Sequence, residues 1–103
     1  GIAWDYSTST LVVSDWEGQR IRRIDIVNNT VTTVAGTGER GHRDGHANRA
    51  TFNEPCFLCC DQAGNIFVAD SKNNAIRCIS TKGVVVTLVG PSHEHSHVGF
   101  QTT

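Results

Sequence analysis

The sequence predicts an all-β protein made of two four-stranded antiparallel sheets, arranged as blades of a partial or assembled β-propeller. The chain contains two copies of one unit, each copy divides into four short strands, and several strands are apolar on both faces. A strand that is apolar on both faces needs cover on both sides. Repeated four-stranded sheets stacked face to face are the blades of a propeller.

The repeat is visible when "LVVSDWEGQRIRRI" (11–24) is set beside "IFVADSKNNAIRCI" (66–79) at an offset of 55. Asp15 and Arg22 then align with Asp70 and Arg77. Downstream "VTTVAG" aligns with "VVTLVG", and upstream "GIAWD" aligns with "FLCCD". We therefore expect one blade over 1–36, a connector loop over 37–54 and a second blade over 55–90. Residues 91–103 are expected to form a connector or tail toward a further blade.

Within each copy, runs rich in Val, Ile and Thr are separated by turn-forming residues. The pattern predicts strands over 1–5, 10–14, 20–26 and 31–35, and again over 56–60, 65–69, 75–79 and 84–89. Connections of three to six residues allow only antiparallel neighbours.

Composition narrows the class of protein. At 103 residues the chain is one domain or a piece of a larger one, with a net charge of -1. Lys and Arg are scattered, which argues against a nucleic-acid binder that relies on phosphate neutralisation. No apolar run reaches the ~20 residues of a membrane span. No secretory leader is visible, but the first residues already resemble a strand within a domain, so a leader upstream of them could have been removed. Together with cysteines interpreted as reduced, this favours an intracellular location without establishing it.

The stretch "EPCFLCCDQAGNIFVADSKNNAIRCI" resembles the NHL repeat. The pattern of that family is Pro-x-Gly-Ile-Ala-Val-Asp, then Gly-Asn-hydrophobic-Tyr-Val-Ala-Asp, then Asn-Asn-Arg-Ile-Arg-Lys-Ile. Pro55 and Gly64 stand at matching positions, and "VTTVAGTGERGHRDG" resembles the long connector of one branch of the family. The resemblance covers about residues 1–90. Phe57 departs from it by replacing Gly, and Trp16-Glu17-Gly18 replaces a small polar turn.

The four cysteines invite a metal hypothesis. Cys56-x-x-Cys59 has the spacing of a zinc half-site, but Cys60 and Cys78 do not repeat that spacing. In the aligned copy, Cys59 and Cys60 take the places of Ala3 and Trp4, which are interpreted as core residues. Free cysteine packs as a small hydrophobe. We expect all four thiols to be reduced, buried and metal-free.

Two histidine groups are further metal candidates. His42, Asp44 and His46 place two imidazoles around a carboxylate, yet Asp44-Gly45 is also a turn signal. In the resembled family an Asp-Gly pair recurs here and an aromatic often stands at the position of His42, which favours packing over metal binding. His93, His95 and His97 alternate along the chain and could line one side of an extended segment; a solvated loop is favoured. No cofactor is expected.

Antiparallel meanders alternate ends, so the second turn of each blade and the connector should emerge on one face. The residues expected there to contact a partner are Trp16, Glu17, Gln19, Arg40, His42, Arg43, Lys72, Asn73 and Asn74. Trp16 is interpreted either as an interface anchor or as a side chain folded back on the connector. Asp15 and Asp70 are expected to cap their turns through backbone N–H groups, with Arg22 and Arg77 as partners.

The chain shows no nucleophile elbow and no phosphate-binding loop. The leading hypothesis is a non-catalytic module that binds a protein partner. The resemblance also allows a propeller that binds single-stranded RNA, which needs a basic surface, and a metal-dependent lyase or hydrolase. The enzyme needs ligands at the central channel, where the inner strands offer Ile2, Trp4, Leu58 and Cys60.

A two-blade unit should leave apolar side chains such as Val12, Ile21, Val68 and Ile76 uncovered on its outer faces. Only ring closure covers every face of a propeller. We therefore expect the chain to be part of a longer propeller or of a ring assembled from several copies.

Overall fold

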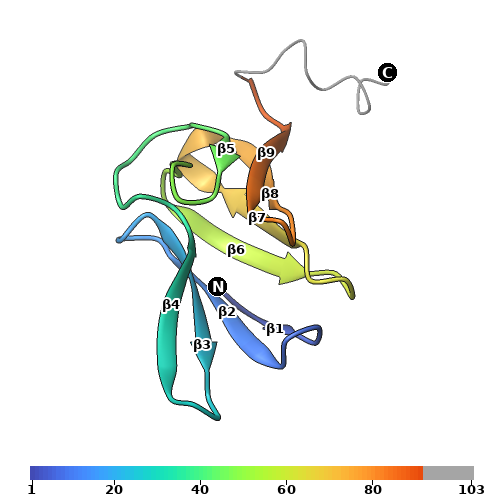
Figure 1. Ribbon diagram of the computed structural model, residues 1–103. Coiled ribbons are helices and arrows are strands. Elements are labelled where there is room, and N and C mark those ends of the chain that lie inside the picture. The colour runs from blue at the N-terminus through green and yellow to red at the C-terminus, as the bar shows by residue number, and fades with distance from the viewer. Residues whose placement is uncertain (92–103) are drawn as a thin grey trace.

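The computed structural model describes residues 1–91 and contains two antiparallel sheets (Figure 1). Blade 1 has the order β1 (Ile2–Asp5), β2 (Thr10–Asp15), β3 (Arg20–Asp25), β4 (Thr30–Ala35). Blade 2 has the order β5 (Gly45–His46), β9 (Val84–Val89), β8 (Ala75–Ile79), β7 (Ile66–Asp70), β6 (Pro55–Cys60). The two-sheet, all-β prediction is confirmed, and each of the eight expected strands lies within one residue of its predicted bounds.

The hairpin turns of blade 1 follow one local pattern. Each four-residue turn ends in a residue with left-handed backbone, Ser9, Gln19 or Asn29, at φ of 56°, 58° and 56°. The aspartate at the end of the preceding strand accepts a hydrogen bond from a turn N–H group: Asp5 from Ser7, Asp15 from Gly18 and Asp25 from Asn28. The aspartate carboxylate thus accepts a hydrogen bond from a turn N–H group that has no acceptor within the sheet.

Asp70 does not follow this pattern, so the expectation that it caps its own turn through backbone N–H groups is wrong. The next segment is a short 3-10 turn, η1 (Ser71–Asn73), which lacks a side-chain cap. Asp70 instead accepts hydrogen bonds from the Asn53 N–H at 2.8 Å and from the Asn73 side chain at 2.7 Å. The connector lies against this end of β7, and its Asn53 is the residue whose backbone N–H group donates to the Asp70 carboxylate.

The connector, expected to be a loop, also contributes a strand. In β5, Gly45 and His46 pair with Val85 and Val84 at the outer edge of blade 2. This pairing satisfies backbone groups that an edge strand would leave open. Gly45 has a φ of +116°, which glycine adopts readily.

The core lies between the two blades. Val12 and Ile21 of blade 1, Val68 of blade 2 and Phe52 of the connector are each 0% exposed. The expectation that Val12, Ile21 and Val68 would lie uncovered is therefore wrong, because these faces pack against each other. Ile76, which is 40% exposed, does remain open. Across residues 1–91, no helix has the length and hydropathy needed to cross a membrane.

Candidate interaction surface

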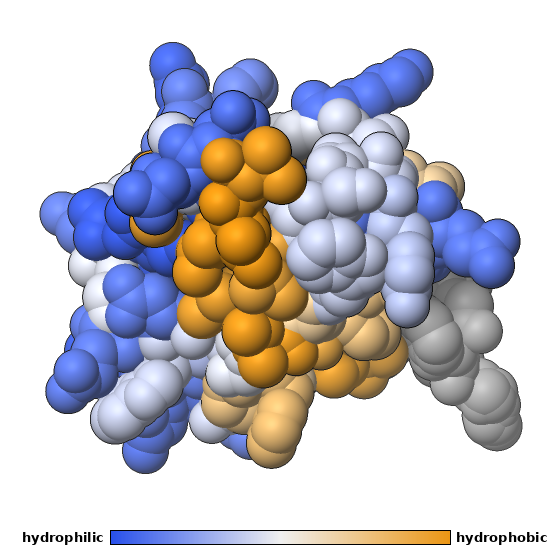
Figure 2. Space-filling view, turned by 90° about the horizontal axis from the view of Figure 1, so that it is seen from below, coloured by the Kyte–Doolittle hydropathy of each residue, from blue (hydrophilic) through white to orange (hydrophobic). Residues whose placement is uncertain are grey.

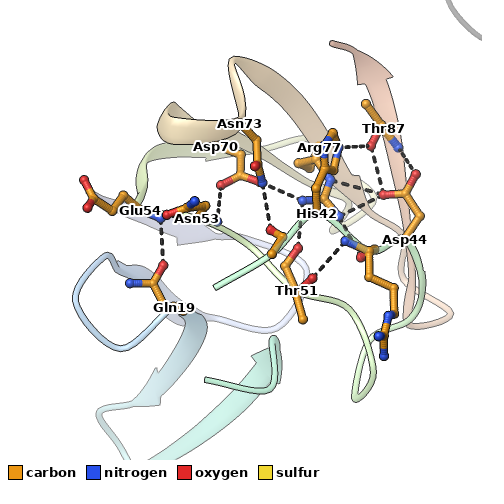
Figure 3. Close-up of polar contacts among 12 residues, drawn as sticks. Gln19, His42, Asp44, Thr51, Asn53, Glu54, Asp70, Asn73, Arg77 and Thr87 are labelled. Carbon is orange, nitrogen blue, oxygen red and sulfur yellow. Dashed lines mark hydrogen bonds and ion pairs between the residues drawn. The ribbon is translucent and has the colours of Figure 1, made fainter. Parts of the chain in front are cut away.

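Three segments meet at one end of the blades: the β2–β3 turn (16–19), the β7–β8 turn (71–74) and the connector (37–54). We call this surface the loop face. Backbone and side-chain hydrogen bonds fix the segments to one another, as Figure 3 shows in part. The Glu54 N–H donates to Gln19 Oε1 at 2.7 Å, the Lys72 N–H donates to the Asn53 carbonyl at 3.0 Å, and Asn73 Nδ2 donates to the Gly41 carbonyl at 2.8 Å.

Gln19 was expected to face a partner, but it is 2% exposed and links the blades. Its side-chain nitrogen donates to the carbonyls of Trp16 and Glu17, at 2.8 and 3.2 Å, while its oxygen accepts from Glu54. Asn73 is half-buried and is bonded to Gly41 and Asp70. The side-chain amides of Gln19 and Asn73 therefore make hydrogen bonds within the fold, because the connector folds over them.

Arg77 is the centre of the polar network below the loop face. Its side chain is fully buried, and Nη1 donates to Asp70 Oδ2 at 2.7 Å and to the Thr51 carbonyl at 2.9 Å. Nη2 donates to the Arg43 carbonyl and to Asp44 Oδ1, both at 2.8 Å. The guanidinium carbon lies 4.8 Å from the centre of the Phe52 ring. One arginine therefore holds the connector onto blade 2 (Figure 3).

Two of the three connector residues considered as metal ligands, His42 and Asp44, belong to this network. Asp44 accepts from Arg77 and from the Thr87 N–H and hydroxyl, at 3.0 and 2.9 Å. His42 Nε2 lies 3.0 Å from Thr87 Oγ1 and is the donor, because that hydroxyl already donates to Asp44. His46 is exposed on β5. Within residues 1–91, no group of three or more His, Cys, Asp or Glu side chains could hold a metal ion. His93, His95 and His97 lie outside the described residues.

The exposed part of the loop face carries both signs of charge. Trp16 is 52% exposed. The other predicted contact residues that are exposed are Glu17, Arg40, Arg43, Lys72 and Asn74. Arg40 pairs with Glu54 across the connector at 2.9 Å. Trp16 also borders a groove of about 330 Å³ on blade 1, together with Val13, Glu17 and Arg22.

The prediction that all cysteines are buried is wrong. Cys59 is exposed, and the other three are half-buried; none is in a disulfide. Burial raises the pKa of the Cys60 thiol, as does the nearby Asp5 carboxylate, and burial likewise raises the pKa of Cys78. Cys59 is exposed because its face of blade 2 has no cover. Trp4, interpreted from the sequence as core, is 38% exposed for the same reason on blade 1 and packs edge-on against Tyr6.

Sequence reasoning missed one polar cluster near the inner strands. Asp5 is 1% exposed and accepts from the Ser7 N–H and hydroxyl, at 3.0 and 2.6 Å, and from Arg23 Nη1 at 2.9 Å. Burial works to raise the pKa of Asp5, but the hydrogen bonds from Ser7 and Arg23 outweigh it, so the pKa is lowered. The Asp-x-Ser spacing was the available signal, since it is typical of an Asx turn.

Two face-to-face antiparallel sheets joined by a long connector define consecutive blades of a β-propeller. Solved structures agree with this. A protein of unknown function from Bacteroides thetaiotaomicron superimposes with a TM-score of 0.80 at 22% identity, over 87% of this chain and 23% of that one. An auxiliary nutrient binding protein from the same organism gives a TM-score of 0.71 at 21% identity, over 86% of this chain and 25% of that one.

Curated relatives identify the repeat. NHL repeat-containing protein 2 from Gallus gallus is 32% identical over 91 residues, which is 86% of this chain and 12% of the relative. Protein SUPPRESSOR OF QUENCHING 1, chloroplastic, from Arabidopsis thaliana is 38% identical over 69 residues, 67% of this chain and 6% of the relative. No family model matches the chain. The chain belongs to the NHL-repeat β-propeller family, and it spans about an eighth or less of the length of these relatives.

Proposed function

We propose that this chain is a non-catalytic protein-interaction module that binds a protein partner through the exposed side chains of the loop face. The observation that carries the proposal is Trp16, which is half-exposed on a turn that Gln19 and Glu54 hold in place. An aromatic side chain on a fixed loop binds a partner with little loss of conformational freedom.

The charges of the loop face support a protein partner over a polyanion. Arg40, Arg43 and Lys72 lie among Glu17, Glu39 and Glu54, so the described face has no basic stripe. A mixed polar rim around an exposed aromatic is typical of protein interfaces. Membership of the NHL-repeat family agrees with such a role.

Peptide phage display on the immobilised chain tests the proposal. Selected peptides should lose about 2 kcal/mol of binding free energy, or roughly 30-fold in Kd, when Trp16→Ala is substituted. The matched control is Tyr6→Ala, which removes an aromatic that is 78% exposed on the β1–β2 turn, at the other end of the blade. Thermal unfolding of both variants checks that the fold is kept.

Two outcomes would overturn the proposal. Peptides that bind Trp16→Ala as well as the parent chain would show that the loop face is not the binding surface. Single-stranded RNA that binds with a steep salt dependence, while no peptide is enriched, would favour the RNA-binding alternative.

A further inference from the structure

Each blade has one face packed in the core and one open face, on which apolar side chains such as Ile2 and Phe57 are 63% and 71% exposed. Figure 2 shows a band of hydrophobic side chains between hydrophilic areas on the underside of the molecule. Further blades of a propeller cover such sheet faces. Trp16 is a different case, because it lies in the turn between β2 and β3 and not on a sheet face.

The aligned turn of blade 2 shows that positions 16 and 17 stay exposed when a connector covers the blade. At the offset of 55, Trp16 aligns with Ser71 and Glu17 aligns with Lys72. The connector lies against this turn of blade 2, because the N–H groups of Ser71 and Lys72 donate to connector carbonyls at 3.3 and 3.0 Å. Both side chains are nevertheless exposed. The exposure of Trp16 and Glu17 is therefore a property of the turn and does not depend on a missing neighbour.

Hydrogen bonds hold the backbone of the β2–β3 turn in place. The carbonyls of Trp16 and Glu17 both accept from Gln19 Nε2, at 2.8 and 3.2 Å. The Gly18 N–H donates to Asp15 Oδ1 at 3.1 Å. An aromatic and an anionic side chain, adjacent in the sequence, are thus presented to solvent by a turn whose backbone is fixed.

The Glu17 carboxylate makes no ion pair within the described part of the chain. The two nearest arginines in the sequence are engaged elsewhere: Arg22 pairs with Asp15 at 3.9 Å, and Arg20 donates to a connector carbonyl at 3.2 Å. An apolar group that covered Trp16 would desolvate the adjacent Glu17 carboxylate without pairing it, which is unfavourable. A cationic group would cover the ring and neutralise the carboxylate together.

We propose that Trp16 and Glu17 together bind a basic side chain of the protein partner, with an arginine guanidinium stacked on the indole ring and paired with the carboxylate. The inference rests on the proposed function, because it names the chemistry of the partner at the same surface. Trp is the aromatic residue whose ring face attracts cations most strongly. Arginine fits better than lysine, since its planar guanidinium stacks on a ring and also donates to a carboxylate. The aligned Ser71 and Lys72 lack both the ring and the anion.

Two peptide phage libraries screened on the immobilised chain are the first test: one contains Arg and Lys, and the other excludes both. Peptides whose binding requires Trp16 should come from the first library and share an arginine. Peptides from the second library that require Trp16 and bind equally tightly would overturn the inference while supporting the proposed function. If neither library yields a peptide that requires Trp16, the proposed function and the inference both fail.

Calorimetric titration of a selected arginine peptide separates cation binding from apolar contact. Trp16→Leu keeps an apolar side chain but removes the ring, and it should weaken binding about tenfold. A purely apolar contact would keep most of its affinity. Glu17→Gln removes the charge and should also weaken binding about tenfold, with a smaller effect at high salt. The matched control is Gln62→Lys, which changes the net charge equally at an exposed position in the β6–β7 turn, at the other end of the blades, and should leave the affinity unchanged.

A charge exchange between the two molecules completes the test. Glu17→Lys should abolish binding of the arginine peptide, and a peptide with glutamate in place of that arginine should bind Glu17→Lys better than it binds the parent. Thermal unfolding checks the fold of every variant. Equal affinities of the parent and Glu17→Lys for the arginine peptide would overturn the inference.

Discussion

Two arginine–aspartate pairs occupy the same position of the repeat in different surroundings. In blade 2, Arg77 and Asp70 are both 0% exposed and lie 2.7 Å apart. In blade 1, Arg22 and Asp15 lie 3.9 Å apart, with side chains 32% and 40% exposed. The connector covers the first pair only. The aligned arginine–aspartate pairs therefore differ: the pair in blade 2 is buried, and the pair in blade 1 is solvated.

This difference predicts unequal effects of matched substitutions. Asp70→Ala leaves the Arg77 charge buried with fewer partners and should lower the free energy of unfolding by about 3–5 kcal/mol. Asp15→Ala removes a solvated ion pair and one turn cap, so about 1 kcal/mol is expected. Urea denaturation of both variants measures the two values. Equal losses of unfolding free energy in the two variants would show that the connector does not shield the Arg77–Asp70 pair from solvent.

Asp5 predicts a dependence of stability on pH. Burial works to raise the pKa of Asp5, but the hydrogen bonds from Ser7 and Arg23 lower it by a larger amount. The folded-state pKa therefore lies below the ordinary 3.8. A group with a lowered folded pKa stabilises the fold fully above its unfolded pKa and loses that contribution as the pH falls through the folded value. Below pH ~4 the unfolding free energy of the parent should therefore fall more steeply than that of Asp5→Asn.

The comparison with Asp5→Asn is needed because Asn28 and Asn65 also lower the pKa values of Asp25 and Asp61 through hydrogen bonds. Those carboxylates contribute equally to both proteins, so the difference between the two pH profiles reports on Asp5. Parallel profiles from pH 6 to pH 2 would contradict the expected role of its hydrogen bonds.

At the scale of elements, the strands follow from local sequence and the connector does not. Each hairpin in blade 1 couples a terminal aspartate with a left-handed residue four positions later, so strand bounds can be predicted from the sequence. The connector lacks such periodicity. Its strand β5 forms only because the edge of β9 lies beside it, and Gln19 becomes buried only because the connector folds over its turn.

Gln19 links the two blades, and its role predicts a loss of stability on truncation. Gln19→Gly keeps the left-handed backbone but leaves the Glu54 N–H of a part-buried hydrogen bond without its acceptor, so the free energy of unfolding should fall by about 1–3 kcal/mol. Asn29→Gly is the matched control, since Asn29 has a φ of 56° and is exposed. Thermal unfolding should show little change in the stability of Asn29→Gly. An equal decrease in the stability of both variants would contradict the role of the Gln19 side chain in linking the blades.

At the scale of the whole molecule, the stability of the described chain depends on one interface between two blades. Val12 and Ile21 from blade 1 meet Ile66, Val68 and Ile79 from blade 2, and Phe52 of the connector completes this core. The blades share their main buried apolar cluster, so we expect them to unfold together.

Ile21 and Ile76 provide a matched test of which face is buried. Ile21→Ala creates a cavity in the core and should cost about 2–5 kcal/mol. Ile76→Ala changes the aligned position on the open face, where a loss of about 1 kcal/mol or less is expected. Urea denaturation at low protein concentration keeps the open face free of other copies. Similar losses would mean that both faces are covered in solution.

The sequence by itself determined the repeat, the eight long strands, their antiparallel order and the family, because these depend on short-range periodicity and turn chemistry. It also placed Trp16, Arg40 and Lys72 on one face, since antiparallel strands alternate ends. Tertiary structure alone decided which copy of each repeated position is buried. Ile21 and Ile76 are locally equivalent, as are Asp15 and Asp70. Ile21 is buried because it faces the other blade and Asp70 because the connector covers it, whereas the aligned Ile76 and Asp15 have no such cover.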